Sequence, residues 1–84
     1  MNYTSKYSEE VQEKRRWAMD NIIIGTKWNL HDMVRRFGDY EQYDPERWNP
    51  KIIQMFYFPE IDMTFMVNLL QGEVATWRTG KEYR

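Results

Sequence analysis

The sequence predicts an α+β fold, with two N-terminal helices packed on a small C-terminal three-stranded antiparallel sheet. In the first half, two stretches combine a helix-capping residue with apolar residues at helical spacing. The second half is dense in aromatic and apolar residues, and a glycine separates its last two apolar segments. At 84 residues the chain can build one core, so we expect a single domain over residues 1–84. Within it, residues 1–7 are expected to form a flexible arm, residues 39–51 a long loop and residues 80–84 a basic tail.

The first helix is expected over residues 8–20. Ser8 can cap its N-terminus, and Glu9 and Glu10 suit the positive end of the helix dipole. Residues 21–25 are ambiguous, because the consecutive isoleucines favour a buried strand but could also finish the first helix, with Gly25 as its C-terminal cap. We favour the strand.

The second helix is expected to begin after Asn29, which can serve as its N-cap, and to stop at Gly38. Its apolar residues follow the i, i+3, i+4, i+7 spacing of one buried stripe: Leu30, Met33, Val34 and Phe37.

The remaining residues predict a loop followed by an antiparallel meander. Pro45 and Pro50 disfavour helix in the residue before each of them, although residues 44–48 can form one short helical turn that starts at Pro45. Residues 52–61 are expected to form a strand, with Pro59 ending its backbone pairing because proline has no N–H to donate. The last two strands, residues 63–70 and 74–79, flank a turn in which Gly72 can adopt a positive φ.

Composition narrows the class of protein. The chain contains four Trp, six Tyr, four Phe and six Met, which can fill a core even in a small domain. It contains no cysteine, which excludes disulfides and thiolate metal sites and favours a reducing compartment. Its apolar runs are far shorter than the roughly 18 residues of a membrane span. We therefore expect a cytoplasmic location and no membrane partner.

The net charge argues against a nucleic-acid-binding protein, and the small number of reactive residues argues against an enzyme. The net charge is −1, so a nucleic-acid partner is possible but disfavoured, because no strong positive field attracts phosphates. His31 is the only histidine, the carboxylates show no spacing that selects a pair, and no glycine-rich phosphate loop is present. We expect a non-enzymatic protein with no cofactor, no metal and no catalytic residues.

Arginines interleaved with aromatic residues suggest a protein-binding surface, because Trp, Tyr and Arg dominate interface hot spots. The candidate partner-binding residues are Trp28, Arg35, Arg36, Tyr40, Tyr43, Trp48 and Arg84. Exposed aromatic residues also leave a homodimer open. A winged-helix DNA-binding protein is an alternative, with residues 29–37 as the recognition helix, although Asp32 on its exposed face would repel phosphate.

One segment resembles phage terminase large subunits, the motors that package DNA. It comprises Ile22, Ile23, Ile24, Gly25, Thr26, Lys27, Trp28 and Asn29, followed by Asp32, Met33, Arg36 and Phe37, and farther on by Phe58, Pro59, Glu60, Ile61 and Asp62. The resemblance covers about residues 21–62 and implies an apolar strand, a turn and a helix, with Thr26 at the position that couples hydrolysis to movement. Lys27 and Asn29 replace the usual Arg and His, and the family's nucleotide-binding and nuclease residues are absent.

These observations lead us to expect a small accessory protein, of phage or mobile-element type, that binds and can inhibit a larger protein. A fragment or relative of a packaging terminase is the alternative that the resemblance implies. A winged-helix DNA-binding protein is the alternative that the two helices and the hairpin leave open.

Overall fold

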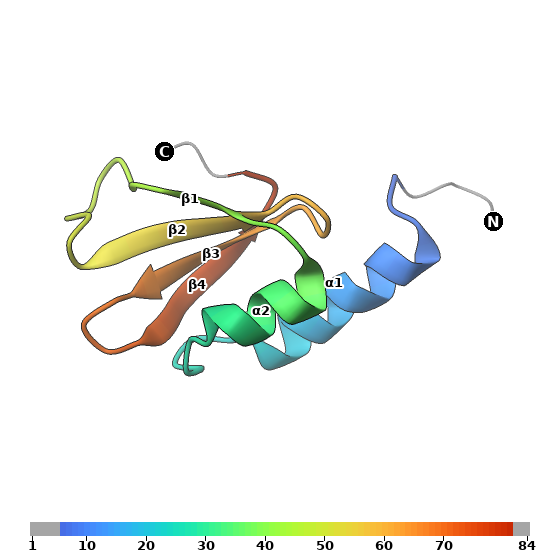
Figure 1. Cartoon of the computed structure of the whole chain (residues 1–84), viewed down its shortest axis with the longest axis horizontal. Helices are drawn as coiled ribbons and strands as arrows, with labels where there is room; N and C mark the ends of the chain where they lie inside the picture. The colour runs from blue at the N-terminus through green and yellow to red at the C-terminus, as the bar shows by residue number, and fades with distance from the viewer. Residues whose placement is uncertain (1–5, 82–84) are drawn as a thin grey trace.

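The computed structural model describes residues 6–81, which form a four-stranded antiparallel sheet with two helices on one face (Figure 1). In chain order the elements are α1 (Glu9–Asn21), α2 (Leu30–Phe37), β1 (Glu41–Tyr43), β2 (Ile53–Phe58), β3 (Met63–Asn68) and β4 (Glu73–Thr79). The strand order is β1-β2-β3-β4. The predicted α+β class is confirmed, whereas the prediction of three strands is wrong because β1 adds a fourth. Most of the predicted N-terminal arm and the end of the basic tail lie outside the described residues.

β1 lies inside the segment that was predicted to be a loop, residues 39–51. It pairs with β2 through Gln42 opposite Phe56. Gln42 Nε2 donates to Gln54 Oε1 (3.0 Å), and Gln54 Nε2 donates to Asp44 Oδ1 (2.8 Å) and to the Pro50 carbonyl (3.0 Å). These side-chain bonds hold the loop against β2, and the short helical turn that residues 44–48 could have formed is absent.

α1 begins as predicted, because Ser8 Oγ accepts a hydrogen bond from the Val11 backbone N–H (3.2 Å). It ends at Asn21 with Ile22 as its C-cap, and the predicted strand over residues 21–25 does not exist. The chain turns instead, with Gly25 at φ 90° and the Thr26 hydroxyl accepting from the Ile23 N–H (3.0 Å). Local hydrogen bonds at Gly25 and Thr26 thus override the strand preference of the isoleucines.

After this turn, residues 25–28 run along the start of β4, and we call this segment the strap. Gly25 N–H donates to the Val74 carbonyl (2.8 Å), and Val74 N–H donates to the Thr26 carbonyl (2.8 Å). Trp28 N–H donates to the Gly72 carbonyl (2.7 Å). The connection between the two helices therefore covers only the first part of the outer edge of β4.

α2 follows the sequence prediction closely. Asn29 Oδ1 accepts from the Asp32 N–H (3.0 Å) at its start, and Gly38 ends it at φ 85°. Met33 and Phe37 are 2% exposed. The predicted apolar stripe therefore directs α2 into the core and leaves its other face outward.

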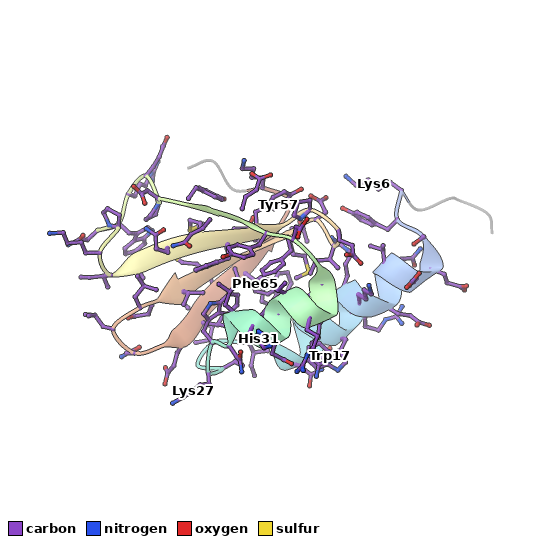
Figure 2. All side chains as sticks on the ribbon, in the orientation of Figure 1. Lys6, Trp17, Lys27, His31, Tyr57 and Phe65 are labelled. Carbon is purple, nitrogen blue, oxygen red and sulfur yellow. The ribbon has the colours of Figure 1, made fainter. Side chains whose placement is uncertain are left out.

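The meander of β2, β3 and β4 is confirmed, and Gly72 has the expected positive φ of 67°. The aromatic core lies on the face of the sheet that the helices cover, and Figure 2 shows Phe65 between the sheet and the helix pair. Phe58 is 0% exposed, with ring centroids 6.1 Å from Phe37 and 5.9 Å from Phe65. A cluster of aromatic rings thus joins β2 and β3 to α2.

Candidate functional site

The outward face of α2, together with the neighbouring side of α1, is the candidate site. We define this α2 surface by Trp17, Asp32, Arg35 and Arg36. Because Met33 and Phe37 point into the core, helical spacing turns Asp32, Arg35 and Arg36 away from it. Both arginines are exposed, so the structure brings two predicted partner-binding residues together on one surface.

Asp32 orients both arginines. Arg35 Nη2 donates to one carboxylate oxygen (3.0 Å) and Arg36 Nε to the other (3.0 Å). These hydrogen bonds, first from Arg35 and then from Arg36, lower the pKa of the Asp32 carboxyl below its ordinary value of 3.8. Exposed pairs of this kind contribute little to folding stability. Their consequence is geometric, because they restrict two otherwise flexible guanidinium groups.

Arg36 also stacks on an aromatic ring. Its guanidinium carbon lies 4.0 Å from the centroid of the Trp17 ring, within the range of a cation–π contact. The Trp17 ring also packs against Phe37, with ring centroids 6.2 Å apart. The predicted set did not include Trp17, although it lies among the interleaved arginines and tryptophans. Only the packing of α1 against α2 places it beside Arg36.

Two other predicted residues, Trp28 and Tyr40, pack on the aromatic core. Their ring centroids lie 5.0 Å and 5.9 Å from that of Phe56. Trp28 is half-buried, and its Nε1 is buried without a hydrogen-bond partner among residues 6–81. Tyr40 is 37% exposed. These two residues therefore serve the core, and Tyr40 alone of the two offers a substantial free surface.

The remaining predicted residues do not join the α2 surface. Tyr43 lies in β1 beside Lys81, whose Nζ is 5.4 Å from the Tyr43 ring centroid. Trp48 is 57% exposed in the loop between β1 and β2. Arg84 lies outside the described residues. The predicted set is thus divided among several parts of the fold.

A polar cluster at the turn between β2 and β3 was not predicted. Asp62 accepts hydrogen bonds from the Tyr7 hydroxyl (2.6 Å) and the Tyr57 hydroxyl (2.8 Å), and Lys6 Nζ lies 3.8 Å away. Arg15 donates to the carbonyls of Ile61 and Asp62. The cluster ties the residues around the start of α1 to the sheet, so its role is structural.

A shallow groove separates the end of α1 from β4. It has a volume of about 490 Å³ and is lined by Met19, Ile23, Ile24, Thr76 and Trp77. Ile23 is 53% and Ile24 76% exposed. The predicted set contained none of these residues, because the isoleucines were assigned to a buried strand.

The histidine and the carboxylates of the described residues form no metal-binding group. His31 is exposed on α2. Residues 6–81 contain no group of three or more His, Asp or Glu side chains arranged to hold a metal ion. Within the same range, neither helix has the length and apolar character to cross a membrane. The chain was also compared with protein-family models, curated proteins and solved structures, and none matches it.

Proposed function

We propose that this chain is a small non-enzymatic binding module that docks its α2 surface onto a larger protein. The observation that carries the proposal is the Arg36 guanidinium 4.0 Å above the Trp17 ring, with Asp32 fixing Arg36 and Arg35. Arginine and tryptophan are enriched among residues that dominate interface energies. Restricting them before binding lowers the entropy lost when the complex forms.

A protein partner suits this surface better than a nucleic acid. Asp32 lies between the two arginines at 3.0 Å from each and offsets part of their charge. The whole chain carries a net charge of −1, which gives no long-range attraction for phosphates. An acidic side chain on the partner could instead pair with Arg35, whose side chain is 69% exposed.

The biological setting belongs to the same proposal. The absence of cysteine supports a reducing cytoplasm. The resemblance of about residues 21–62 to a packaging-motor segment suggested an accessory protein of phage or mobile-element type, but the apolar strand that it implies does not form at residues 22–24. Such a protein can inhibit its target by occupying a functional surface.

The proposal is tested by affinity capture from host extract with matched variants. Arg36→Ala removes the stacked guanidinium, and Arg47→Ala removes the same charge from an exposed loop position. A specific target protein should be retained by the wild type and by Arg47→Ala. Its affinity for Arg36→Ala should fall by about 30-fold, the effect of losing a hot spot of about 2 kcal/mol. Capture that is insensitive to Arg36→Ala, or tight salt-sensitive binding of duplex DNA with no protein retained, would refute the proposal.

A further inference from the structure

The outer edge of β4 is only partly covered. The strap pairs with its start, where Lys27 bridges to Glu73 and Val74 exchanges hydrogen bonds with Gly25 and Thr26. Over residues 75–79, which we call the open edge, no further strand of the described chain pairs with β4. An uncovered edge presents backbone donors and acceptors that can pair with another strand.

Trp77, at the centre of the open edge, directs its backbone outward. Successive residues of an antiparallel ladder alternately point their backbone groups towards and away from the neighbouring strand. Gly80 N–H donates to the Asp62 carbonyl (2.7 Å), so the alternation turns Arg78 towards β3 and Trp77 and Thr79 away from it. In agreement, the Trp77 carbonyl accepts a bond from the Arg78 side chain (3.2 Å).

The open edge carries some of the features that protect exposed strands, namely the charge of Arg78 and a bulge, and lacks others. Its sequence, Ala-Thr-Trp-Arg-Thr, contains no Pro, Lys or acidic residue, and the only irregularity is the bulge near its start. The groove beside it adds exposed apolar side chains, with Ile24 76% exposed. Backbone pairing and apolar contact are therefore both available at one place.

We propose that a second copy of this chain covers the open edge, with the two β4 strands antiparallel about a two-fold axis at Trp77. Trp77 of each copy then donates its N–H to the Trp77 carbonyl of the other. Ala75 of one copy lies opposite Thr79 of the other, and Thr76 opposite Arg78. The strap at one end and the turn at Gly80 (φ 79°) at the other confine pairing to the same residues in both copies.

The side chains of the open edge match this self-pairing. Arg78 lies opposite Thr76 of the second copy, so like charges do not meet. Within one chain Arg78 Nη1 already lies 3.3 Å from Thr76 Oγ1, and the same donor and acceptor can pair across the axis. By register Trp77 lies on the same face as the buried Phe65, so the two Trp77 side chains meet beside the grooves.

The expected dimer is reversible. A standard interface buries about 800 Å² per partner, roughly a seventh of the 5778 Å² accessible surface of this chain. The open edge and the groove residues form a smaller contact than that. We expect a dissociation constant on the order of 1–100 μM, measured by sedimentation equilibrium.

Thr79→Pro tests the backbone pairing. Thr79 is exposed and its N–H points away from β3, so proline removes an outward donor without breaking the β3 ladder. The dissociation constant should rise by about 10-fold or more, whereas Thr79→Val, which keeps the N–H and the branched shape, should change it by less than about 2-fold. Ile24→Lys should also weaken the dimer, and Leu70→Lys, at a residue that is 75% exposed outside the groove, should not.

Cross-linking tests the register. The chain has no cysteine, so Thr76→Cys and Arg78→Cys chains each carry a single thiol. In the proposed register, position 76 of one copy faces position 78 of the other at about 4.5 Å between Cα atoms, within disulfide reach. Two residues with the same number, one in each copy, lie diagonally across the two strands, with their Cα atoms about 7–8 Å apart. Oxidation should therefore cross-link an equimolar mixture of the two variants much faster than either variant alone.

Three results would overturn the proposal. The first is a wild-type protein that stays monomeric at several hundred micromolar. The second is a dimer that is insensitive to both Thr79→Pro and Ile24→Lys. The third is an open edge that binds an extended peptide from another protein and not a second copy. None of these bears on the α2 surface, because Arg36→Ala should leave dimerisation unchanged and Thr79→Pro should leave the Arg36 and Trp17 contact intact.

Discussion

Replacing Asp62 by asparagine gives the sharpest test of how the start of α1 is attached to the sheet. Asp62 accepts hydrogen bonds from the Tyr7 hydroxyl (2.6 Å) and the Tyr57 hydroxyl (2.8 Å). Its φ is 53°, a left-handed conformation that Asn tolerates as well as Asp. Asp62→Asn therefore removes the negative charge and changes neither the shape of the side chain nor the strain of the backbone.

The expected loss of stability follows from these two bonds. A hydrogen bond to a charged group contributes about 1.5–3 kcal/mol and a neutral bond about 0.5–1.5 kcal/mol. The asparagine amide can still pair with both hydroxyls, so the variant loses the charge assistance and keeps the bonds. The Asp62 side chain is 23% exposed, and solvent weakens the effect. We expect the free energy of unfolding near neutral pH to fall by about 2 kcal/mol.

The same variant makes a prediction about pH. The hydrogen bond from Tyr7 lowers the pKa of Asp62 below 3.8, with further lowering from the Tyr57 hydroxyl and from the charges of Lys6 and Arg15. A carboxyl with a depressed pKa in the folded state stabilises the fold above its unfolded pKa. That contribution is lost as the pH falls through the folded pKa. The difference in stability between wild type and variant should therefore shrink below about pH 4.

Urea unfolding followed by tryptophan fluorescence, at about pH 7 and about pH 3, measures both effects. Asp39→Asn is the control, because Asp39 is exposed, and it should change stability by less than about 0.5 kcal/mol. A variant as stable as the wild type near pH 7, or a difference that persists unchanged at about pH 3, would show that the Asp62 charge does not hold this attachment.

Two further predictions concern the core and the end of α2. Phe58→Leu should lower the free energy of unfolding by about 1–3 kcal/mol, because it leaves a void among the aromatic rings. Leu70→Ala, at a residue that is 75% exposed, should lower it by less than about 0.5 kcal/mol. Urea unfolding measures both variants. Gly38→Ala should cost about 1–3 kcal/mol, since Gly38 has φ 85° and ψ −154° and a Cβ there would lie 2.5 Å from Glu60 Oε1. Gly25→Ala shares the strain of a positive φ (90°) but has no atom within 4 Å of the added Cβ, so it should cost less only by what is needed to move the flexible Glu60 carboxylate that pairs with Lys14; a larger loss at Gly25 than at Gly38 would contradict the steric argument.

The parts of the fold that the sequence predicted correctly depend on local chemistry. Ser8 and Asn29 cap their helices through bonds to residues three positions ahead, and Gly72 supplies a positive φ at a turn. Each of these features is complete within a few neighbouring residues. A pattern of residue types along the chain was therefore sufficient to find them.

The parts that were predicted wrongly depend on distant residues. β1 has no apolar alternation of its own, and it is a strand because β2 offers a paired edge. Ile23 and Ile24 were assigned to a buried strand by residue preference, yet Gly25 and Thr26 turn the chain and leave them exposed. For the same reason the sequence suggested Arg36 as a contact but could not show that Trp17 supports it.

The α2 surface and the open edge of β4 are separate because of the geometry of α1. Trp17 and Met19 are two positions apart, so their side chains point about 200° apart around the helix. Trp17 contacts Arg36 and Phe37 on the α2 side, whereas Met19 lines the groove beside β4. Pairing along β4 would therefore leave both α2 surfaces of the dimer free. A target with two matching sites could then be bound with an avidity about 10²–10⁴ times the affinity of one site, provided that the spacing allows both contacts. Thr79→Pro would remove that gain and leave the affinity of each single site unchanged, which separates dimerisation from target recognition.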